Sequence, residues 1–180
     1  MKRLFILFFI QCIIISVFAQ KFIVDGITYK INPNQKDVTV VKGSEPYAGN
    51  IVIPSTVAND DKTYTVTHIG YEAFKNSEIT SISLPEGLIE IGVRAFSECQ
   101  DLKQIVIPLS VVNIESEAFI FCFSLSKLTF KSKTRPTIGE RAFGKTEVKM
   151  SGISTAIPSN MAVPNNKHLQ VDQKSRIVVY

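Results

Sequence analysis

Two cysteines are the side chains in this sequence that are best placed to do chemistry together. Cys99 and Cys122 lie 23 residues apart, and each follows a phenylalanine by three positions. A catalytic thiol needs a nearby base, and no motif assigns a base to either cysteine. Two other roles stay open. The thiols could form a disulfide, or they could be a buried column of free thiols that bond weakly to backbone carbonyls.

The histidines and acidic residues do not make a recognisable metal or catalytic motif. His68 and His168 are 100 residues apart, with no cysteine or acidic cluster beside them. Asp60 and Asp61 lack the alternating oxygen ligands of a calcium loop. The phosphate-binding, nucleophile-elbow, zinc-protease and dinucleotide fingerprints are absent. We therefore predict no catalytic residue, no metal and no cofactor. A hydrolase stays the weakest alternative, because two carboxylates far apart in sequence can meet in space.

Residues 1–19 have the pattern of a secretory signal peptide. Lys2 and Arg3 precede an apolar run from Leu4 to Phe18, and Ala19 supplies a small residue for cleavage. The run has 15 residues, fewer than the ~20 that a membrane span needs, so a transmembrane anchor is the weaker alternative. The sequence predicts export across the inner membrane to the cell surface, the periplasm or the medium. After cleavage we expect no membrane span.

Composition argues against nucleic acid as a partner. Of the 180 residues, 45% are hydrophobic, and the net charge of +4 includes Lys2 and Arg3 of the leader. The chain has no cluster of lysines and arginines of the kind that binds phosphates.

One hexapeptide is written four times, as IGYEAF, IGVRAF, IESEAF and IGERAF, beginning at residues 69, 91, 114 and 138. The four phenylalanines are 22, 23 and 24 residues apart, and short alternating stretches such as IVIP at 105–108 recur in step. A period of this length is typical of leucine-rich repeats. No copy can bury its inner face alone, so we expect the copies to stack. The residues expected in the stacked core are Ile69, Phe74, Ile91, Phe96, Ile114, Phe119, Ile138 and Phe143.

Each copy predicts a short strand, a second extended piece and a tight turn. In QIVIP, Ile105 and Ile107 face inward and Pro108 ends the strand by removing a backbone donor. The EAF segment is expected to begin a turn or a single helical turn whose alanine and phenylalanine pack inward. The phenylalanines then form a column, in which each buried ring contributes roughly 1.5–3 kcal/mol.

The pattern I-G-x-x-A-F-x-x-C-x-x-L-x-x-I-x-I-P, which residues 91–108 match at its marked positions, resembles the BspA-type leucine-rich repeat of bacterial secreted and surface proteins. The resemblance implies a β-rich α/β solenoid, a short right-handed stack of about four repeats with brief helical turns and an N-terminal β cap. It also implies that Cys99 and Cys122 are free, because the family pattern has one cysteine per repeat. A bridge between neighbouring repeats stays the alternative, since parallel strands lie ~4.8 Å apart.

The chain divides into four segments on this interpretation. Residues 1–19 are the signal peptide, and 20–65 are a β-rich cap with a first, degenerate repeat. Residues 66–150 are the leucine-rich repeats, and 151–180 are a degenerate last repeat or a C-terminal cap.

The outward positions of the predicted strands are the candidate binding face. Solenoids present such rows as extended surfaces, although a solvated face without a partner is the alternative. The residues are Ser81, Ser83, Gln104, Val106, Lys127 and Thr129. Two further positions stand out. His68 is expected to face solvent. Phe121 occupies a position that is polar in other copies, which indicates either a contact surface or packing against the C-terminal segment.

The resemblance implies a non-enzymatic secreted or cell-surface protein that mediates adhesion or another protein–protein interaction. The expected partner is a host matrix protein or another cell-surface protein. A glycan-binding accessory protein is the second hypothesis, and it would require aromatic platforms on one face.

Overall fold

The structure is a computed structural model that describes residues 20–33, 36–132, 136–144, 146, 148–151, 169–171 and 176–179. The predicted signal peptide, residues 1–19, and most of the predicted C-terminal segment lie outside these ranges.

The longest sheet joins the N-terminal strands to the repeats. Its strands are β1 (Lys21–Val24), β2 (Ile27–Ile31), β3 (Asp37–Val41), β5 (Thr56–Asn59), β6 (Lys62–Ile69), β8 (Glu90–Ile91), β10 (Asn113–Ile114) and β12 (Thr137–Ile138). β1, β2 and β3 pair antiparallel, and β3 then pairs parallel with β6. β6, β8, β10 and β12 follow in parallel order, while β5 forms a hairpin with β6. The repeats therefore continue a sheet that begins outside them.

The other strand of each repeat lies on a second side of the molecule. The strands on this side are β4 (Ala48–Val52), β7 (Glu78–Ser83), β9 (Gln104–Ile107), β11 (Lys127–Phe130) and β13 (Val148–Ser151), followed beyond the repeats by β14 (Leu169–Val171) and β15 (Arg176–Val179). β4 pairs parallel with β7. β9, β11 and β13 pair parallel, and β15 and β14 extend that sheet antiparallel. Each repeat thus supplies one strand to each side, and we call one such repeat a rung.

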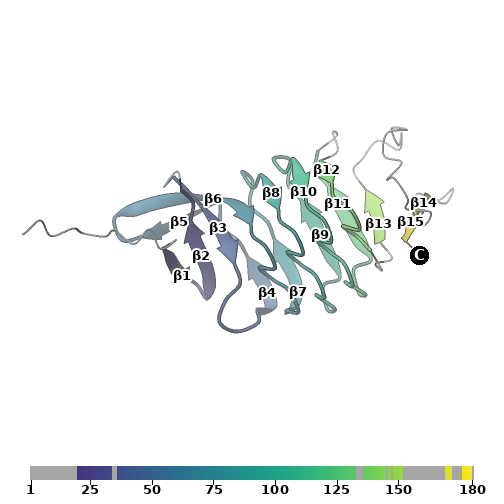
Figure 1. The fold of residues 1–180 in the computed structure, drawn as a ribbon, viewed down its shortest axis with the longest axis horizontal. Coiled ribbons are helices and arrows are strands. Elements are labelled where there is room, and N and C mark those ends of the chain that lie inside the picture. The colour runs from purple at the N-terminus through teal and green to yellow at the C-terminus, as the bar shows by residue number, and fades with distance from the viewer. Residues whose placement is uncertain are drawn as a thin grey trace, which may run out of the picture.

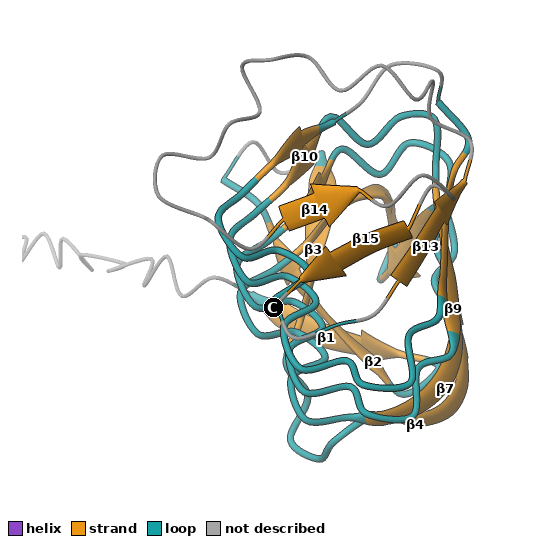
Figure 2. Ribbon diagram, turned by 90° about the vertical axis from the view of Figure 1, so that its right-hand side faces the viewer, coloured by secondary structure: helices purple, strands orange, loops and turns teal. Residues whose placement is uncertain are grey.

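The rungs are stacked side by side along one axis, so the molecule is an elongated solenoid (Figure 1). Seen along that axis, β4, β7 and β9 lie along one side, β3 and β10 along another, and the connecting turns along the remaining one (Figure 2). The predicted solenoid built from stacked repeats is therefore found.

A column of aromatic rings fills the core on the turn side. Phe74, Phe96, Phe119 and Phe143 stack with ring centroids 5.0–5.2 Å apart and interplanar angles of 7° or less. Tyr47 continues the column toward the N-terminus, 4.8 Å from Phe74 but tilted by 48°. Of the eight core positions expected from the sequence, seven are buried and Ile138 is partly buried.

The predicted helical turns are wrong, since the described residues contain no helix. A helix needs φ near −63° at every residue, and the turn of the first clear repeat has Glu72 at φ 50° and Asn76 at φ 54°. The turn instead donates backbone N–H groups to the next rung, Phe74 to the Ala95 carbonyl at 2.8 Å and Asn76 to Ser97 at 2.9 Å. These bonds to the next rung alternate along the turn with local bonds to the carbonyl three residues back, such as Lys75 to Glu72 at 3.2 Å. The described residues therefore form strands and turns, without the α-helical part of the expected α/β solenoid.

The glycine of the repeat motif allows close approach of neighbouring rungs. A Cβ atom on Gly92 would lie 2.8 Å from the carbonyl oxygen of Ile69 in the preceding rung. The same position holds Glu115 in the third copy.

Candidate functional site

The predicted binding residues lie on the outward side of β4, β7, β9 and β11, a surface that we call the strand face. Within it, Gln104 is paired with Lys127 and Val106 with Thr129 on adjacent strands. Residues Asn50 and Val52 of β4 continue the rows beside Ser81 and Ser83. Ser83, Gln104, Val106 and Lys127 are exposed, whereas Ser81 and Thr129 are half-buried.

The strand face is divided between β7 and β9, which belong to different hydrogen-bonded sheets. A long bond of 3.5 Å from the Lys103 N–H to the Thr80 carbonyl links the two strands. The predicted residues are therefore brought together in two pairs of strands rather than in one continuous ladder.

The strand face carries small polar groups and isolated apolar side chains. The side-chain oxygen of Asn50 accepts hydrogen bonds from the hydroxyls of Thr80, at 2.9 Å, and Ser81, at 2.8 Å. Val52 is 69% exposed and Val106 is 43% exposed. Small polar groups with isolated apolar side chains suit a protein surface, and the face carries no aromatic ring that could form a sugar platform.

A ladder of alternating charges runs along the turn side, at the residue before the alanine of each repeat. Arg94 Nε lies 2.6 Å from Glu117 Oε2, and Arg141 Nη1 lies 3.1 Å from Glu117 Oε1. Arg94 also lies 3.9 Å from Glu72, which accepts a 3.0 Å bond from Lys75. The Lys75 bond lowers the pKa of Glu72, and the Glu117 bond raises the pKa of Arg94. All four ladder residues have positive φ.

The sequence contained a signal for this ladder, because its four positions in chain order hold Glu, Arg, Glu and Arg. The alternation of charge from one copy to the next, rather than the repeated residues, predicts this pairing between rungs.

The cysteines belong to a second column, three residues after each phenylalanine. Cys99 and Cys122 are free and fully buried. The Cys99 thiol donates to the Phe74 carbonyl at 2.9 Å, and the Cys122 thiol donates to the Phe96 carbonyl at 3.0 Å. The hydroxyl of Thr146 makes the same bond to the Phe119 carbonyl, also at 2.9 Å. A hydroxyl can therefore replace a thiol as the hydrogen-bond donor in this column.

Burial makes these thiols poor nucleophiles. It raises the pKa of the Cys99 thiol from 9.0 to about 12, and it raises the pKa of the Cys122 thiol as well. Only the thiolate reacts at a useful rate. The column is suited to holding rungs together and not to catalysis.

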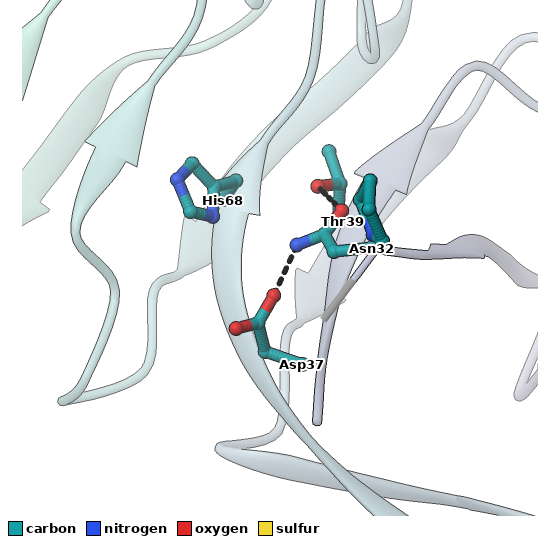
Figure 3. A pocket seen from close by; sticks show the side chains of 5 residues that line it. Asn32, Asp37, Thr39 and His68 are labelled. Atoms are coloured by element: carbon teal, nitrogen blue, oxygen red, sulfur yellow. Dashed lines mark hydrogen bonds between the residues drawn. The ribbon is translucent and has the colours of Figure 1, made fainter. Parts of the chain in front are cut away.

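His68 lies in a pocket that sequence analysis missed. The pocket has a volume of about 410 Å³ and is lined by Asn32, Pro33, Asp37, Thr39 and His68 (Figure 3). The strand pairing of β3 with β6 sets Thr39 opposite His68. The side chain is half-buried, so the expected exposure of His68 to solvent is found only in part, through this open pocket. No repeat signal could have found the site, since Asn32, Asp37 and Thr39 precede the repeats.

Phe121 and Phe123 flank Cys122 on the surface. Phe123 is 61% exposed, and the two rings lie 6.0 Å apart at an angle of 52°. Phe121 has φ 61°, a conformation that is unusual for a bulky side chain. The pair is tilted rather than stacked, so it does not provide a flat platform for a sugar ring.

Within the described ranges, no group of three or more His, Cys, Asp or Glu side chains is arranged to hold a metal ion. The same residues include no helix with the length and apolar character needed to cross a membrane.

Comparison with known proteins identifies the repeat. The family profile described as "BspA type Leucine rich repeat region (6 copies)" matches residues 62–165, more than half of the chain. No curated protein sequence matches.

Several solved structures share the fold. A leucine-rich repeat protein from Bacteroides capillosus is 24% identical with a TM-score of 0.60, over 74% of this chain and 98% of that one. The leucine-rich repeat protein of T. pallidum is 23% identical with a TM-score of 0.60, over 74% and 64% of the two chains. The pneumococcal vaccine antigen PcpA is 23% identical with a TM-score of 0.51, over 74% and 46%. At these identities the likeness establishes the fold.

Proposed function

This chain belongs to the BspA-type leucine-rich repeat family, and from that premise we propose that it is a non-enzymatic secreted or cell-surface protein that binds another protein through its strand face. The partner class that we propose is a matrix protein or a surface protein of another cell.

The observation that supports this proposal is the composition of the strand face. Its rows expose Val52 and Val106 among small polar side chains. Ser83 lies next to Val52 by strand pairing, and Val106 follows Ser83 by one repeat. An apolar residue that stays exposed on a regular sheet costs nothing to desolvate, so its burial by a partner is favourable. A broad surface of this kind fits a protein better than a small molecule.

The export that the sequence predicts supports the same proposal. The N-terminal residues 1–19 have the charge, apolar run and small residue of a signal peptide. An exported chain would meet matrix proteins and the surfaces of other cells.

The test is a binding screen with residues 20–180, the chain that remains after the proposed cleavage. Extracellular-matrix proteins are immobilised, and binding is measured by surface plasmon resonance. We expect saturable binding to at least one of them. The Ser83→Arg variant should bind at least about tenfold more weakly, because a long charged side chain would stand in the contact.

A matched control is Leu109→Arg, which adds the same charge at a residue that is 62% exposed just beyond β9. This variant should bind as the unchanged protein does. Binding to no matrix protein, or equal weakening by both variants, would contradict the proposal.

A further inference from the structure

We propose that the pocket lined by Asn32, Pro33, Asp37, Thr39 and His68 binds one sugar residue of a neutral polysaccharide. The pocket lies between the end of β2, the start of β3 and the end of β6 (Figure 3). It is on a different side of the solenoid from the strand face, so this site is independent of the protein-binding function proposed above.

The polar groups of the pocket are held in place by one another. The Thr39 hydroxyl donates to the side-chain oxygen of Asn32 at 2.7 Å. The Asn32 amide nitrogen donates in turn to Asp37 Oδ1, and the Asn32 backbone N–H donates to the Asp37 carbonyl at 3.0 Å. Groups that are fixed before binding lose little entropy when a ligand arrives.

His68 is fixed from the other side of the pocket. Its Nδ1 atom lies 2.7 Å from the hydroxyl of Thr67, which is buried. That bond leaves the other ring nitrogen, Nε2, for a ligand. His68 lies on β6, Asp37 and Thr39 lie on β3, and Asn32 follows the end of β2. The β2–β3 and β3–β6 pairings therefore bring hydrogen-bonding atoms from three parts of the chain to one pocket.

The mixture of donors and acceptors defines the ligand class. The Asp37 carboxylate accepts only, the Asn32 amide nitrogen donates only, and the Thr39 hydroxyl does both. A carboxylate repels an anion, so phosphate and sulfate are poor candidates. A metal cation takes lone pairs and accepts no hydrogen bond, so it would leave the remaining amide N–H of Asn32 unmatched. A hydroxyl group donates and accepts, and neighbouring hydroxyls on a sugar match the whole set.

The surroundings favour a polymer over a free sugar. The pocket volume of about 410 Å³ is within the ~300–1,000 Å³ of small-molecule sites. However, the pocket is open to solvent and would enclose only one face of a ligand. Polar side chains continue away from it in register, with His68 beside Glu90 and Glu90 beside Asn113. Asn113 donates to Glu115 and, at 3.5 Å, to Glu90. This polar row gives later sugar units further hydrogen-bonding partners.

The test uses residues 20–180 and four neutral polysaccharides, namely dextran, glycogen, mannan and laminarin. Affinity is measured by isothermal titration calorimetry and by amide chemical shifts in NMR spectra. We expect at least one polysaccharide to bind and to shift the signals of residues 32, 37, 39 and 68. Asp37→Asn and His68→Ala should each weaken binding about tenfold, the effect of losing one well-placed hydrogen bond.

The control is Glu140→Gln, an exposed substitution on the turn side that should leave binding unchanged. Melting temperatures of all variants show whether each has folded, and Asp37→Asn keeps the shape of the side chain if His68→Ala does not fold. The proposal is overturned if no neutral polysaccharide binds, if both pocket variants bind as the unchanged protein does, or if sulfated dextran binds more tightly than dextran. The matrix-protein screen measures a different ligand, so the protein-binding proposal and the polysaccharide proposal can each fail without the other.

Discussion

The turn side and the strand face are built from the same rungs, yet they differ in how strictly their residues repeat. On the turn side every clear rung supplies a phenylalanine to one column, and a serine, cysteine or threonine lies three residues later. On the strand face, the position of Val106 is Ser83 in the preceding rung and Thr129 in the next. Positions that repeat serve the contact between rungs, which is the same everywhere. The strand-face positions that vary are those where we propose that a partner protein binds.

The largest effect that separates the two regions is expected from the phenylalanine column. Phe96 is fully buried and stacks on a ring at each face. Phe96→Ala should lower the free energy of unfolding by about 3–5 kcal/mol, because it leaves a cavity between rungs. Phe123→Ala removes a ring that is 61% exposed and should cost less than about 1 kcal/mol. Urea denaturation measures both, and equal losses would show that the column does not carry the stack.

The buried thiols should lower the stability of the protein at alkaline pH. Between pH 9 and 12 the unfolded chain releases the Cys99 proton while the folded chain keeps it. The unfolded state is then favoured, and the free energy of unfolding falls by up to about 1.4 kcal/mol per pH unit for each such thiol.

The double variant Cys99→Ser, Cys122→Ser should remove most of this decline and stay folded at neutral pH, because Thr146 already makes the same bond with a hydroxyl. Thermal melts at pH 8 and pH 10.5 compare the two proteins. Parallel loss of stability in both would rule out the thiols as its cause. The side chain of Tyr29, whose pKa burial also raises to about 12, is common to both proteins.

A smaller effect is expected from the charge ladder. Glu117 contacts two arginines that are 43% and 49% exposed, and exposed pairs are worth at most about 1 kcal/mol. Glu117→Gln should therefore lower the free energy of unfolding by less than about 1 kcal/mol at low salt, and the difference should shrink at high salt. Glu140→Gln is the matched control. A loss that does not depend on salt would mean that Glu117 acts through packing.

Acid should weaken the same ladder at its N-terminal end. The folded-state pKa of Glu72 is lowered, so its contribution is complete above the unfolded pKa near 4.5 and is lost as the pH falls through the folded value. Glu72→Gln should flatten the acid side of the stability curve, measured by urea denaturation from pH 6 to pH 3. If Glu72→Gln loses stability between pH 6 and pH 3 as steeply as the unchanged protein does, Glu72 is not the group responsible.

Sequence predicted the repeated parts of the molecule well, because a period of 22–24 residues tests the same interpretation several times. The stacked Phe74, Phe96 and Phe119 and the end of β9 before Pro108 follow from it. The helical turns were wrong because Glu72 and Arg94 take positive φ without glycine, and only hydrogen bonds to the next rung explain that choice. The sequence could not predict the pocket, because Thr39 and His68 meet through the β3–β6 pairing, and β3 lies outside the repeat.

The most direct test of the division between the two regions is to measure affinity and melting temperature together for Val106→Arg and Glu117→Gln. The ligand is the matrix protein that binds most tightly in the screen. We predict that Val106→Arg binds at least about tenfold more weakly with an unchanged melting temperature, since an exposed substitution alters stability by about 0.5 kcal/mol or less. Glu117→Gln should melt earlier and bind with full affinity. Full binding by Val106→Arg, or loss of binding by Glu117→Gln, would contradict the account.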